Sequence, residues 1–588
     1  MPVKAYLRLV VFILGGFTLV SAGFYIRHCY QFINAITQNQ SRSTKKKIKL
    51  SIPFDSNKLE EFFECGDQEY KKGNLESAIT NYRKALATYP SIVEALLRLG
   101  KTFAKQDKHE LAIIEYKSAL TINPRHLVTY LLLSRSLHAQ KKAEDAIIIL
   151  ERALTLNPTC PEIYIELAKM FTDTQEYDKA LSLIDKAEQC NPKNVNVLLN
   201  RGHVLNWKGD IVGAIEAYKK ATLLDPTCAN AHYNLGHTLK VYGKMHDAIN
   251  SLTKAAELDS YHIDTHIALS HAYWALGDFK NAWQEYEWRW KRYKKNQHIT
   301  GISQWHGQDL KDKTILLYSE QGLGDTLQFI RFAQELKKNG ATVWCKVQKP
   351  LINLLSWCPY IDHLVTNEDQ KELRQNINFQ APLMSMPGIL KTTPQTIPAL
   401  IPYLYADSSL IKKWKDRLAQ DKKLKIGICW HVEQHHEIYK LPIAKRAISI
   451  QNFLPLANHD NISLYCLQRS DENLQNKIPN ELQLTIFPTD FDNTNGRFMD
   501  SAAVIANLDI IITVDTAIAH LAGGLGKEVW MLLPYSSDCR WYLQSDRSPW
   551  YPTMRIFRQP EPGNWKVVMD KINNEITKLI DSNKALHS

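Results

Sequence analysis

The sequence predicts a multidomain protein: a membrane-spanning helix comes first, then an all-helical solenoid, then an α/β region with two parallel sheets and a cleft. Three observations support this prediction. Residues 9–26 form an 18-residue run without a charge, alanines recur every 34 residues from Ala78 to Ala282, and strand-turn-helix-strand patterns follow Trp290. A chain of 588 residues is also too long for one hydrophobic core. We expect a membrane anchor with a basic linker at 1–50, a solenoid at 59–292, and α/β halves at 305–405 and 423–575.

The composition is that of an ordinary globular protein, with 45% hydrophobic and 23% charged residues. The formal net charge of +11 comes mainly from residues 1–50, which carry eight Lys or Arg side chains and no Asp or Glu. Beyond residue 50, 64 basic residues face 61 acidic ones. The body is therefore nearly neutral, and a nucleic-acid partner is not implied.

The uncharged run at 9–26 is just long enough to cross a membrane as a helix. Arg27 and the basic cluster at 42–49 outweigh Lys4 and Arg8, so the positive-inside tendency places the body in the cytoplasm. We therefore expect a single-pass protein of the inner (cytoplasmic) membrane. A cleaved signal peptide, with Val20-Ser-Ala22 as its cleavage site, is the alternative. The ten cysteines lack the spacing of a disulfide framework, which argues against export.

The internal repeat is the clearest pattern in the chain. Alanines at the 34-residue interval alternate with larger apolar residues four positions later, and proline ends most repeats. The recurring alanines are Ala78, Ala112, Ala146, Ala180, Ala214, Ala248 and Ala282. Small residues let two antiparallel helices approach closely, and each helix pair leaves an apolar face that the next pair covers. Residues 59–292 resemble seven tetratricopeptide repeats, which implies a concave surface for a protein partner.

The α/β region begins with a buried strand that leads into a tight turn at Glu320–Asp325. An amphipathic helix at Thr326–Asn339 and a strand at Ala341–Val347 follow, which makes a βαβ unit. The second half begins with a strand at Lys425–Trp430 and repeats this order, ending with strand Ile510–Val514, a turn at Asp515-Thr516, a helix and strand Val529–Leu533. These patterns predict two doubly wound sheets with a cleft between them.

Two motifs in this region carry a second resemblance. They are Glu320-Gln-Gly-Leu-Gly-Asp-Thr-Leu-Gln-Phe-Ile-Arg331 and, further along, Ile512-Thr-Val-Asp-Thr-Ala-Ile-Ala-His-Leu-Ala522. Together they resemble the heptosyltransferase-like glycosyltransferases of GT-B fold, in the bacterial branch with N-terminal tetratricopeptide repeats. The resemblance implies two Rossmann-like domains, an acceptor domain followed by a nucleotide-sugar donor domain. It also implies a metal-independent enzyme that needs no cofactor, since the nucleotide-sugar is a substrate.

Asp325 follows the two-glycine turn at the carboxyl end of a predicted strand, where such a sheet opens onto its cleft. In the family, the aspartate of this turn is the proposed general base that deprotonates the acceptor hydroxyl. The two glycines of the turn, Gly322 and Gly324, are expected to belong to the donor-binding residues. The alternative role of Asp325 is to cap the helix that follows.

The residues after strand Ile510–Val514 stand at a predicted helix N-terminus, whose free N–H groups suit a diphosphate. By resemblance, Thr516 and Ala517 contact the donor's phosphates and Asp515 the hydroxyls of its sugar. His520, one turn further, faces the cleft. The alternative is again capping, with His520 as a packed helix residue.

The loop after Trp430 supplies a basic group in the family, which neutralises the diphosphate leaving group. Arg446 fits this role best, with Lys440 and Lys445 as alternatives. The loop departs from the branch at 431–437, which puts the donor preference and activity itself in doubt. His431, His435 and Glu437 could suggest a metal site, but a solvated polar loop is favoured and no metal is predicted.

Two functions follow from the sequence. The first is a glycosyltransferase that transfers sugar to a hydroxyl of a protein or cell-envelope glycan, with the repeats binding the acceptor or a partner. The alternative is a membrane-anchored interaction scaffold whose GT-B half has lost catalysis. Tryptophans between Trp283 and Trp305 are expected to cover the last repeat. The helix expected at Trp565–Ile580 commonly crosses back to the first half in GT-B folds.

Overall fold

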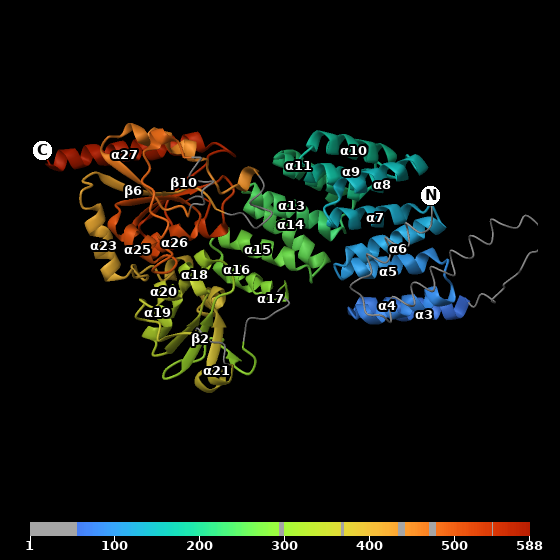
Figure 1. Ribbon diagram of the computed structural model, residues 1–588, viewed down its shortest axis with the longest axis horizontal. Coiled ribbons are helices and arrows are strands. Elements are labelled where there is room, and N and C mark those ends of the chain that lie inside the picture. Colours follow the sequence, from blue (N-terminus) through green and yellow to red (C-terminus); the bar gives the residue numbers. More distant parts are fainter. Residues whose placement is uncertain are drawn as a thin grey trace, which may run out of the picture. The chain divides into compact units, whose positions relative to one another are not determined.

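The computed structural model describes residues 56–292, 299–365, 370–432, 442–469, 478–543 and 545–587 (Figure 1). The chain divides into two compact units, residues 1–123 and 124–588. No helix among the described residues is long and apolar enough to cross a membrane. The anchor predicted at 9–26 lies outside the described ranges.

The first unit contains two helix pairs, α3 (Ser56–Lys72) with α4 (Leu75–Thr88) and α5 (Val93–Lys105) with α6 (His109–Ile122). Close approach within each pair depends on a missing side chain. A Cβ at Gly66 would lie 2.4 Å from the ring of Tyr82, and one at Gly100 would lie 2.3 Å from the ring of Tyr116. At these repeat positions, the glycine of one helix therefore leaves room for the tyrosine ring of the other.

The second unit continues the repeat with five more pairs. They are α7 (Leu127–Ala139) and α8 (Ala143–Leu156), α9 (Pro161–Asp173) and α10 (Tyr177–Cys190), α11 (Val195–Lys208) and α12 (Ile211–Leu224), α13 (Ala229–Val241) and α14 (Met245–Leu258), and α15 (Ile263–Ala275) and α16 (Phe279–Tyr286). The repeat alanines from Ala146 to Ala282 are fully buried. The predicted repeat is confirmed, because seven helix pairs follow one another from α3 to α16. A short helix, α17 (Arg289–Arg292), follows.

The first α/β half is a parallel sheet with the strand order β1-β5-β2-β3-β4. Its strands are β1 (Ser303–Gln304), β2 (Thr314–Tyr318), β3 (Thr342–Lys346), β4 (His363–Leu364) and β5 (Phe379–Pro382). The helix predicted at Thr326–Asn339 is two helices, α18 (Leu323–Phe329) and α19 (Arg331–Lys338). The first of them begins earlier than predicted, inside the glycine-bearing turn. The side chain of Arg331, beside the break, is buried and donates to the hydroxyl of Tyr403 at 2.8 Å.

The second half is a parallel sheet with the order β10-β9-β8-β6-β7. Its strands are β6 (Leu424–Cys429), β7 (Ile462–Cys466), β8 (Ile510–Val514), β9 (Glu528–Leu533) and β10 (Met554–Arg558), and its helices include α25 (Met499–Asn507) and α26 (Ala517–Gly524). Because β7 lies on one side of β6 and β8 on the other, the strand order reverses between β6 and β8. Ligands of such sheets bind beside the carboxyl ends at that point.

The C-terminal helix α27 (Trp565–His587) differs from the expectation that it crosses back to the first half. Its apolar side chains, among them Val568, Ile572 and Ile576, pack into a core with Ile428, Trp530 and other residues of the second sheet. The helix therefore covers the half to which it belongs.

One hydrophobic core joins the last repeat to both α/β halves. Trp274 of α15 and Trp283 of α16 lie in it with Phe329 of α18 and Trp550 of the second half. The rings of Trp274 and Trp550 lie 6.2 Å apart, and those of Trp274 and Trp283 lie 4.4 Å apart. The expectation that tryptophans cover the last repeat is thus met by packing against the α/β region.

A buried ion pair fixes the same junction. The guanidinium of Arg289 donates two hydrogen bonds to the carboxylate of Glu320, at 2.7 and 2.9 Å, and the two side chains are 2% and 1% exposed. The same guanidinium donates to Ser385 at 2.7 Å. Because Glu320 opens the turn that ends at Asp325, this pair positions the turn from the helix that follows the repeats.

Candidate functional site

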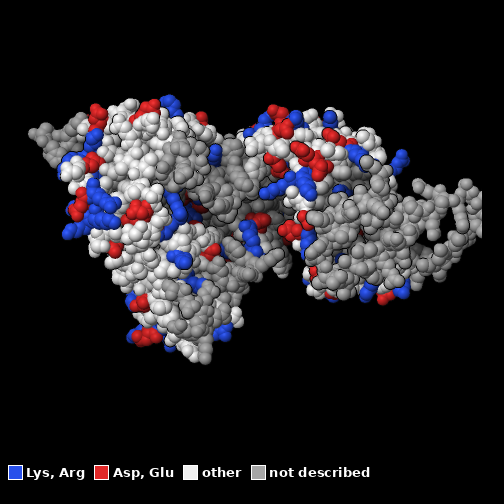
Figure 2. Space-filling model, in the orientation of Figure 1, with Lys and Arg blue, Asp and Glu red and all other residues white. Residues whose placement is uncertain are grey.

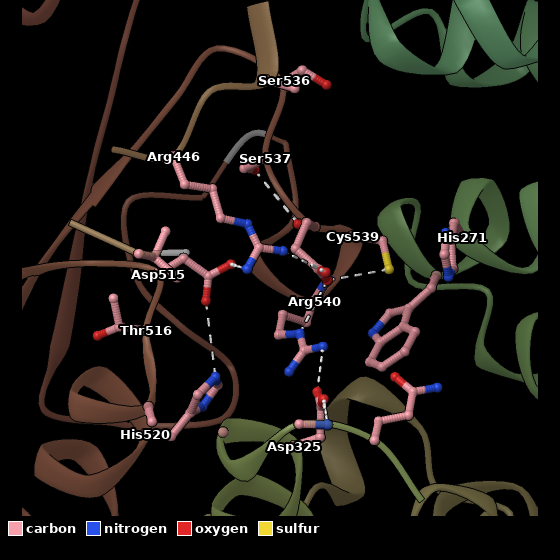
Figure 3. Close-up of a pocket in the computed structure, with 18 of the residues that line it drawn as sticks. His271, Asp325, Arg446, Asp515, Thr516, His520, Ser536, Ser537, Cys539 and Arg540 are labelled. Carbon is pink, nitrogen blue, oxygen red and sulfur yellow. Dashed lines mark hydrogen bonds and ion pairs between the residues drawn. The ribbon is translucent and has the colours of Figure 1, made fainter. Parts of the chain in front are cut away.

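A cavity of about 1980 Å³ lies within the second unit, at the carboxyl ends of both sheets. Its lining includes repeat helices α13 and α15, the turn at 320–325, and loops of the second sheet between Trp430 and Leu543. Figure 3 shows the residues at its centre. On the outer face drawn in Figure 2, acidic and basic side chains are interspersed, in keeping with the nearly neutral body.

The predicted site residues meet in this cavity although they lie far apart in the sequence. Those that line it are Gly322, Gly324, Asp325, Arg446, Asp515, Thr516, Ala517 and His520. His431 also lines it, whereas Lys440, His435 and Glu437 lie outside the described residues. Gly324 lets the two halves approach, because a Cβ there would lie 2.9 Å from Cδ2 of His520.

Asp325 lies in the first turn of α18, whose N-cap residue is Gly322. One carboxylate oxygen accepts a hydrogen bond from the Gly322 N–H at 3.0 Å, and the other accepts one from Nη2 of Arg540 at 2.8 Å. Asp325 therefore supports the helix start from inside the turn rather than as the N-cap itself. Its carboxylate still lines the cavity, where a base would have to lie.

Arg540 is the main site residue to which no role was assigned from the sequence. It follows β9, and its guanidinium also donates to Oδ1 of Asp538 at 3.0 Å and to Oε1 of Gln328 at 2.7 Å. Burial alone would lower its pKa, but Asp538, Asp325 and Asp515 raise it well above the ordinary value, so the guanidinium stays charged. The signal available in the sequence was its position after a strand of a parallel sheet.

Asp515 lies beside Arg446 in Figure 3, and Asp538, in the loop after β9, lines the same cavity. Arg446 lies 3.5 Å from Oδ2 of Asp515 and 3.6 Å from Oδ2 of Asp538, which is longer than a close ion pair. Burial works to raise the pKa of Asp538, but Arg540 and Arg446 hold it below its usual range. Asp538 therefore stays charged between the two arginines.

Thr516 is the N-cap residue of α26, but its hydroxyl makes no capping hydrogen bond; it lies 3.2 Å from the hydroxyl of Thr513. The first N–H groups of a helix have no partner within it. Thr516 and Ala517 line the cavity, so the first N–H groups of α26 lie beside the cavity.

His520 is a packed residue as well as a cavity residue. Its ring is 3% exposed, stacks against Trp541 with centroids 5.5 Å apart, and bonds the hydroxyl of Tyr551 through Nδ1 at 2.8 Å. Its Nε2 lies 3.9 Å from Asp515. Burial, together with Arg540, lowers the pKa of His520 to about 3, so the ring is neutral near pH 7.

This burial predicts sensitivity to acid. The unfolded chain binds a proton at His520 with a pKa of about 6.5, whereas the folded protein does so only at about 3. The free energy of unfolding should therefore fall as the pH drops from about 6.5 towards 3. The unfolding midpoint of wild type should drop more than that of His520→Gln between about pH 7 and pH 4.5. Equal drops in both proteins would contradict this assignment.

The repeat helices form one wall of the cavity. His237 and Lys240 of α13 and His271 of α15 line it. Burial lowers the pKa of His237 to about 3, and burial also lowers that of Lys240. The sequence predicted these helices, but it did not predict that they line the same cavity as the site residues.

Among the described residues there is neither a candidate metal site nor a disulfide bond. No group of three or more His, Cys, Asp or Glu side chains there could hold a metal ion. The nine described cysteines are free thiols. Buried Cys429 lies near the site, and burial raises the pKa of its thiol to about 11.

Comparisons with known proteins identify the N-terminal region. Models described as TPR repeat match residues 66–107 and 202–240, and models described as tetratricopeptide repeat match 137–201, 93–126 and 229–262. The N-terminal region therefore carries tetratricopeptide repeats, as predicted, and these support binding of a protein partner.

Among curated proteins, the chain is similar to protein FlbA of Caulobacter vibrioides, with 26% identity over 324 residues. The match covers 51% of this chain and 52% of FlbA, so the chain spans about half the length of this relative. Solved structures that are similar include a thermophilic TPR protein of Thermus thermophilus, with 22% identity, a TM-score of 0.28, and coverage of 31% of this chain and 98% of that one. A tetratricopeptide repeat protein from Parabacteroides merdae shows 18% identity, a TM-score of 0.33, and coverage of 41% and 95%.

Proposed function

Because tetratricopeptide repeats here precede two parallel-sheet halves that share one cavity, we propose that this chain is a glycosyltransferase of GT-B type. It moves a sugar from a nucleotide-sugar donor to a hydroxyl of a protein or cell-envelope glycan. One observation carries the proposal: the eight predicted site residues, which come from both halves, line a single cavity at the carboxyl ends of the sheets. No metal or cofactor is part of the proposed reaction.

The donor side belongs to the second half. Asp515 and Thr516 follow β8 at the point where the strand order reverses, the usual ligand position in such sheets. The free N–H groups at the start of α26 suit the diphosphate, and Arg446 is placed to neutralise its charge as it leaves. Asp515 would hold the hydroxyls of the donor's sugar.

The acceptor side belongs to the first half and the repeats. Asp325 is the proposed base, and a carboxylate suits this role within hydrogen-bond reach of the acceptor hydroxyl. The wall formed by α13 and α15 offers Lys240 and two histidines to an acceptor that enters along the repeats. The seventh repeat shares its core with the α/β region, so point substitutions such as Lys240→Ala test this wall better than deletion of the solenoid.

The membrane attachment remains part of the proposal. Residues 9–26 would anchor the protein as a single pass in the inner membrane, with the body in the cytoplasm. Full-length protein should fractionate with membranes, and its body should be digested by protease only after the cells are opened. Recovery of active protein from the periplasm, cleaved after Ala22, would rule this out.

A second candidate is a scaffold that binds partners without catalysis. The observation that favours it is the engagement of both oxygens of Asp325, by Gly322 and Arg540. Two measurements in sequence separate the candidates, because only the transferase turns over a nucleotide-sugar donor.

The experiment measures the thermal midpoint of the full-length protein with UDP, GDP, ADP and dTDP, each compared with its nucleoside. One of the diphosphates should raise the midpoint, because a ligand of the folded state at 100 times its Kd stabilises by about 2.7 kcal/mol. Arg446→Gln should reduce this rise, because its guanidinium is the proposed partner of the diphosphate. Arg555→Gln is the matched control, since Arg555 lies outside the cavity and pairs with Glu575 at 2.9 Å.

The matching sugar nucleotide is then tested for hydrolysis and transfer. Binding with turnover supports the transferase, and binding without turnover supports a scaffold that retains the donor site. If none of the diphosphates raises the midpoint above its nucleoside, the glycosyltransferase proposal fails.

A further inference from the structure

An ion pair crosses the cavity from one α/β half to the other. Asp325 belongs to α18 of the first half, and Arg540 follows β9 of the second. Nη2 of Arg540 donates to Oδ1 of Asp325 at 2.8 Å, as Figure 3 shows. Nε of the same guanidinium donates to Asp538, and Nη1 donates to Gln328. The proposed base is thus held by an arginine from the half that would bind the donor.

The charges around this pair are unsuited to a diphosphate as they stand. Two arginines face three carboxylates, which gives the cluster a formal net charge of −1; its members are Arg446, Arg540, Asp325, Asp515 and Asp538. An incoming diphosphate would meet three negative groups, while both arginines are directed at them. Its binding at these two arginines is therefore strengthened when one of them exchanges a carboxylate for a phosphate oxygen.

Arg540 is the arginine whose exchange would affect the base. Arg446 lies 3.5 Å from Asp515 and 3.6 Å from Asp538, and neither of these carboxylates is the proposed base. Arg540 makes close contacts, and one of them is with the carboxylate that must accept the acceptor's proton. Guanidinium groups bind carboxylates and phosphates through the same fork of N–H donors, so one can replace the other.

We propose that Arg540 exchanges partners during the reaction: it holds Asp325 before the donor binds and contacts the donor's diphosphate afterwards, which frees Asp325 to act. This inference rests on the proposed function. Asp325 then takes the proton of the acceptor hydroxyl as the hydroxyl oxygen forms its bond to the anomeric carbon. The bond from that carbon to the diphosphate breaks, and the electron pair leaves on the diphosphate, opposite Arg446 and Arg540. Arg540 is thus a positioning residue for Asp325 and a ligand of the leaving group.

The exchange has a consequence that a merely structural ion pair does not share. Asp325 and the diphosphate compete for one guanidinium, so removal of the Asp325 charge releases Arg540 for the ligand. The free energies of the two contacts are then coupled through a shared residue. A variant that damages the proposed base should bind the nucleoside diphosphate more tightly than the wild type does.

The test measures the Kd of the nucleoside diphosphate that stabilises the wild-type protein most among UDP, GDP, ADP and dTDP. Asp325→Asn should lower the Kd at least about threefold, since coupling between contacting residues is typically worth about 2–150-fold. Arg540→Gln should raise it at least about tenfold, as loss of a charge-assisted contact does. The double variant should bind like Arg540→Gln, because no arginine then remains to be released by the loss of the carboxylate.

Matched controls come from Arg555 and Glu575, whose ion pair at 2.9 Å lies outside the cavity. Arg555→Gln, Glu575→Gln and their double variant should leave the Kd unchanged, and thermal midpoints should show that every variant is folded. An unchanged or weaker affinity in Asp325→Asn would overturn the exchange. So would an equal gain in the Arg540→Gln background, which would indicate simple repulsion between Asp325 and the diphosphate. Absence of any diphosphate binding by wild type overturns the proposed function, and this inference with it.

Discussion

Replacement of Asp325 by Asn should lower the turnover of sugar transfer at least about a hundredfold, because general-base catalysis is typically worth about 10²–10⁴-fold. Asn keeps the size of the side chain and can still accept from the Gly322 N–H, but it cannot take the acceptor's proton. Donor affinity should not weaken. Steady-state kinetics with the identified sugar nucleotide, run beside a thermal midpoint, separates loss of chemistry from loss of fold.

The matched control for this variant is Asp362→Asn. Asp362 belongs to the same α/β half, pairs with Lys337 at 2.6 Å, and accepts from the Val343 N–H at 2.7 Å, but it does not line the cavity. Its substitution should leave turnover unchanged. Wild-type turnover in Asp325→Asn would refute the proposed mechanism.

Substitution of Arg289 by Met should destabilise the α/β region by about 3–5 kcal/mol, the usual cost of leaving one partner of a buried ion pair uncompensated. Glu320 is 1% exposed, and burial already raises its pKa while Arg289 acts against that shift. Without Arg289 the buried carboxylate keeps the hydrogen bond from the Met384 N–H at 3.2 Å but loses its counter-charge, so it must stay charged uncompensated or take up a proton. Urea unfolding of the purified protein, followed by tryptophan fluorescence, measures the loss.

Two further variants calibrate this result. Arg289→Met combined with Glu320→Gln removes the uncompensated charge and should recover part of the stability. Lys337→Met breaks the more exposed pair with Asp362, which should cost about 1 kcal/mol or less. A cost for Arg289→Met as small as that of Lys337→Met would show that the junction does not depend on this pair.

The sequence predicted the repeats well because their spacing is a direct record of helix packing. All seven alanines that recur every 34 residues from Ala78 to Ala282 are fully buried. The predicted strands lie close to β2, β3, β6, β8 and β9, since buried parallel strands are short continuous apolar runs. The other five described strands, β1, β4, β5, β7 and β10, were not predicted. The helix after Asp325 was predicted as one because its apolar pattern continues across the break at Ile330.

Contacts between distant segments lay beyond such patterns. Arg540 meets Asp325 across 215 positions, and no local spacing reports that pairing. The wall formed by His237 and Lys240 was equally hidden, because the repeat pattern specifies how helices pack on one another and not what their concave side faces. The C-terminal helix α27 was predicted as amphipathic, but an apolar stripe does not say which of two sheets it will cover.

The core shared by the seventh repeat and the α/β region bears on how this chain could change over time. Arrays of repeats ordinarily gain or lose whole units with little penalty, because each unit contacts only its neighbours. Here Trp274 and Trp283 belong to the same core as Phe329 and Trp550, so the last unit cannot be exchanged for a generic one. Relatives with longer or shorter arrays should therefore differ towards the N-terminal end, while the unit next to the cavity keeps its aromatic residues.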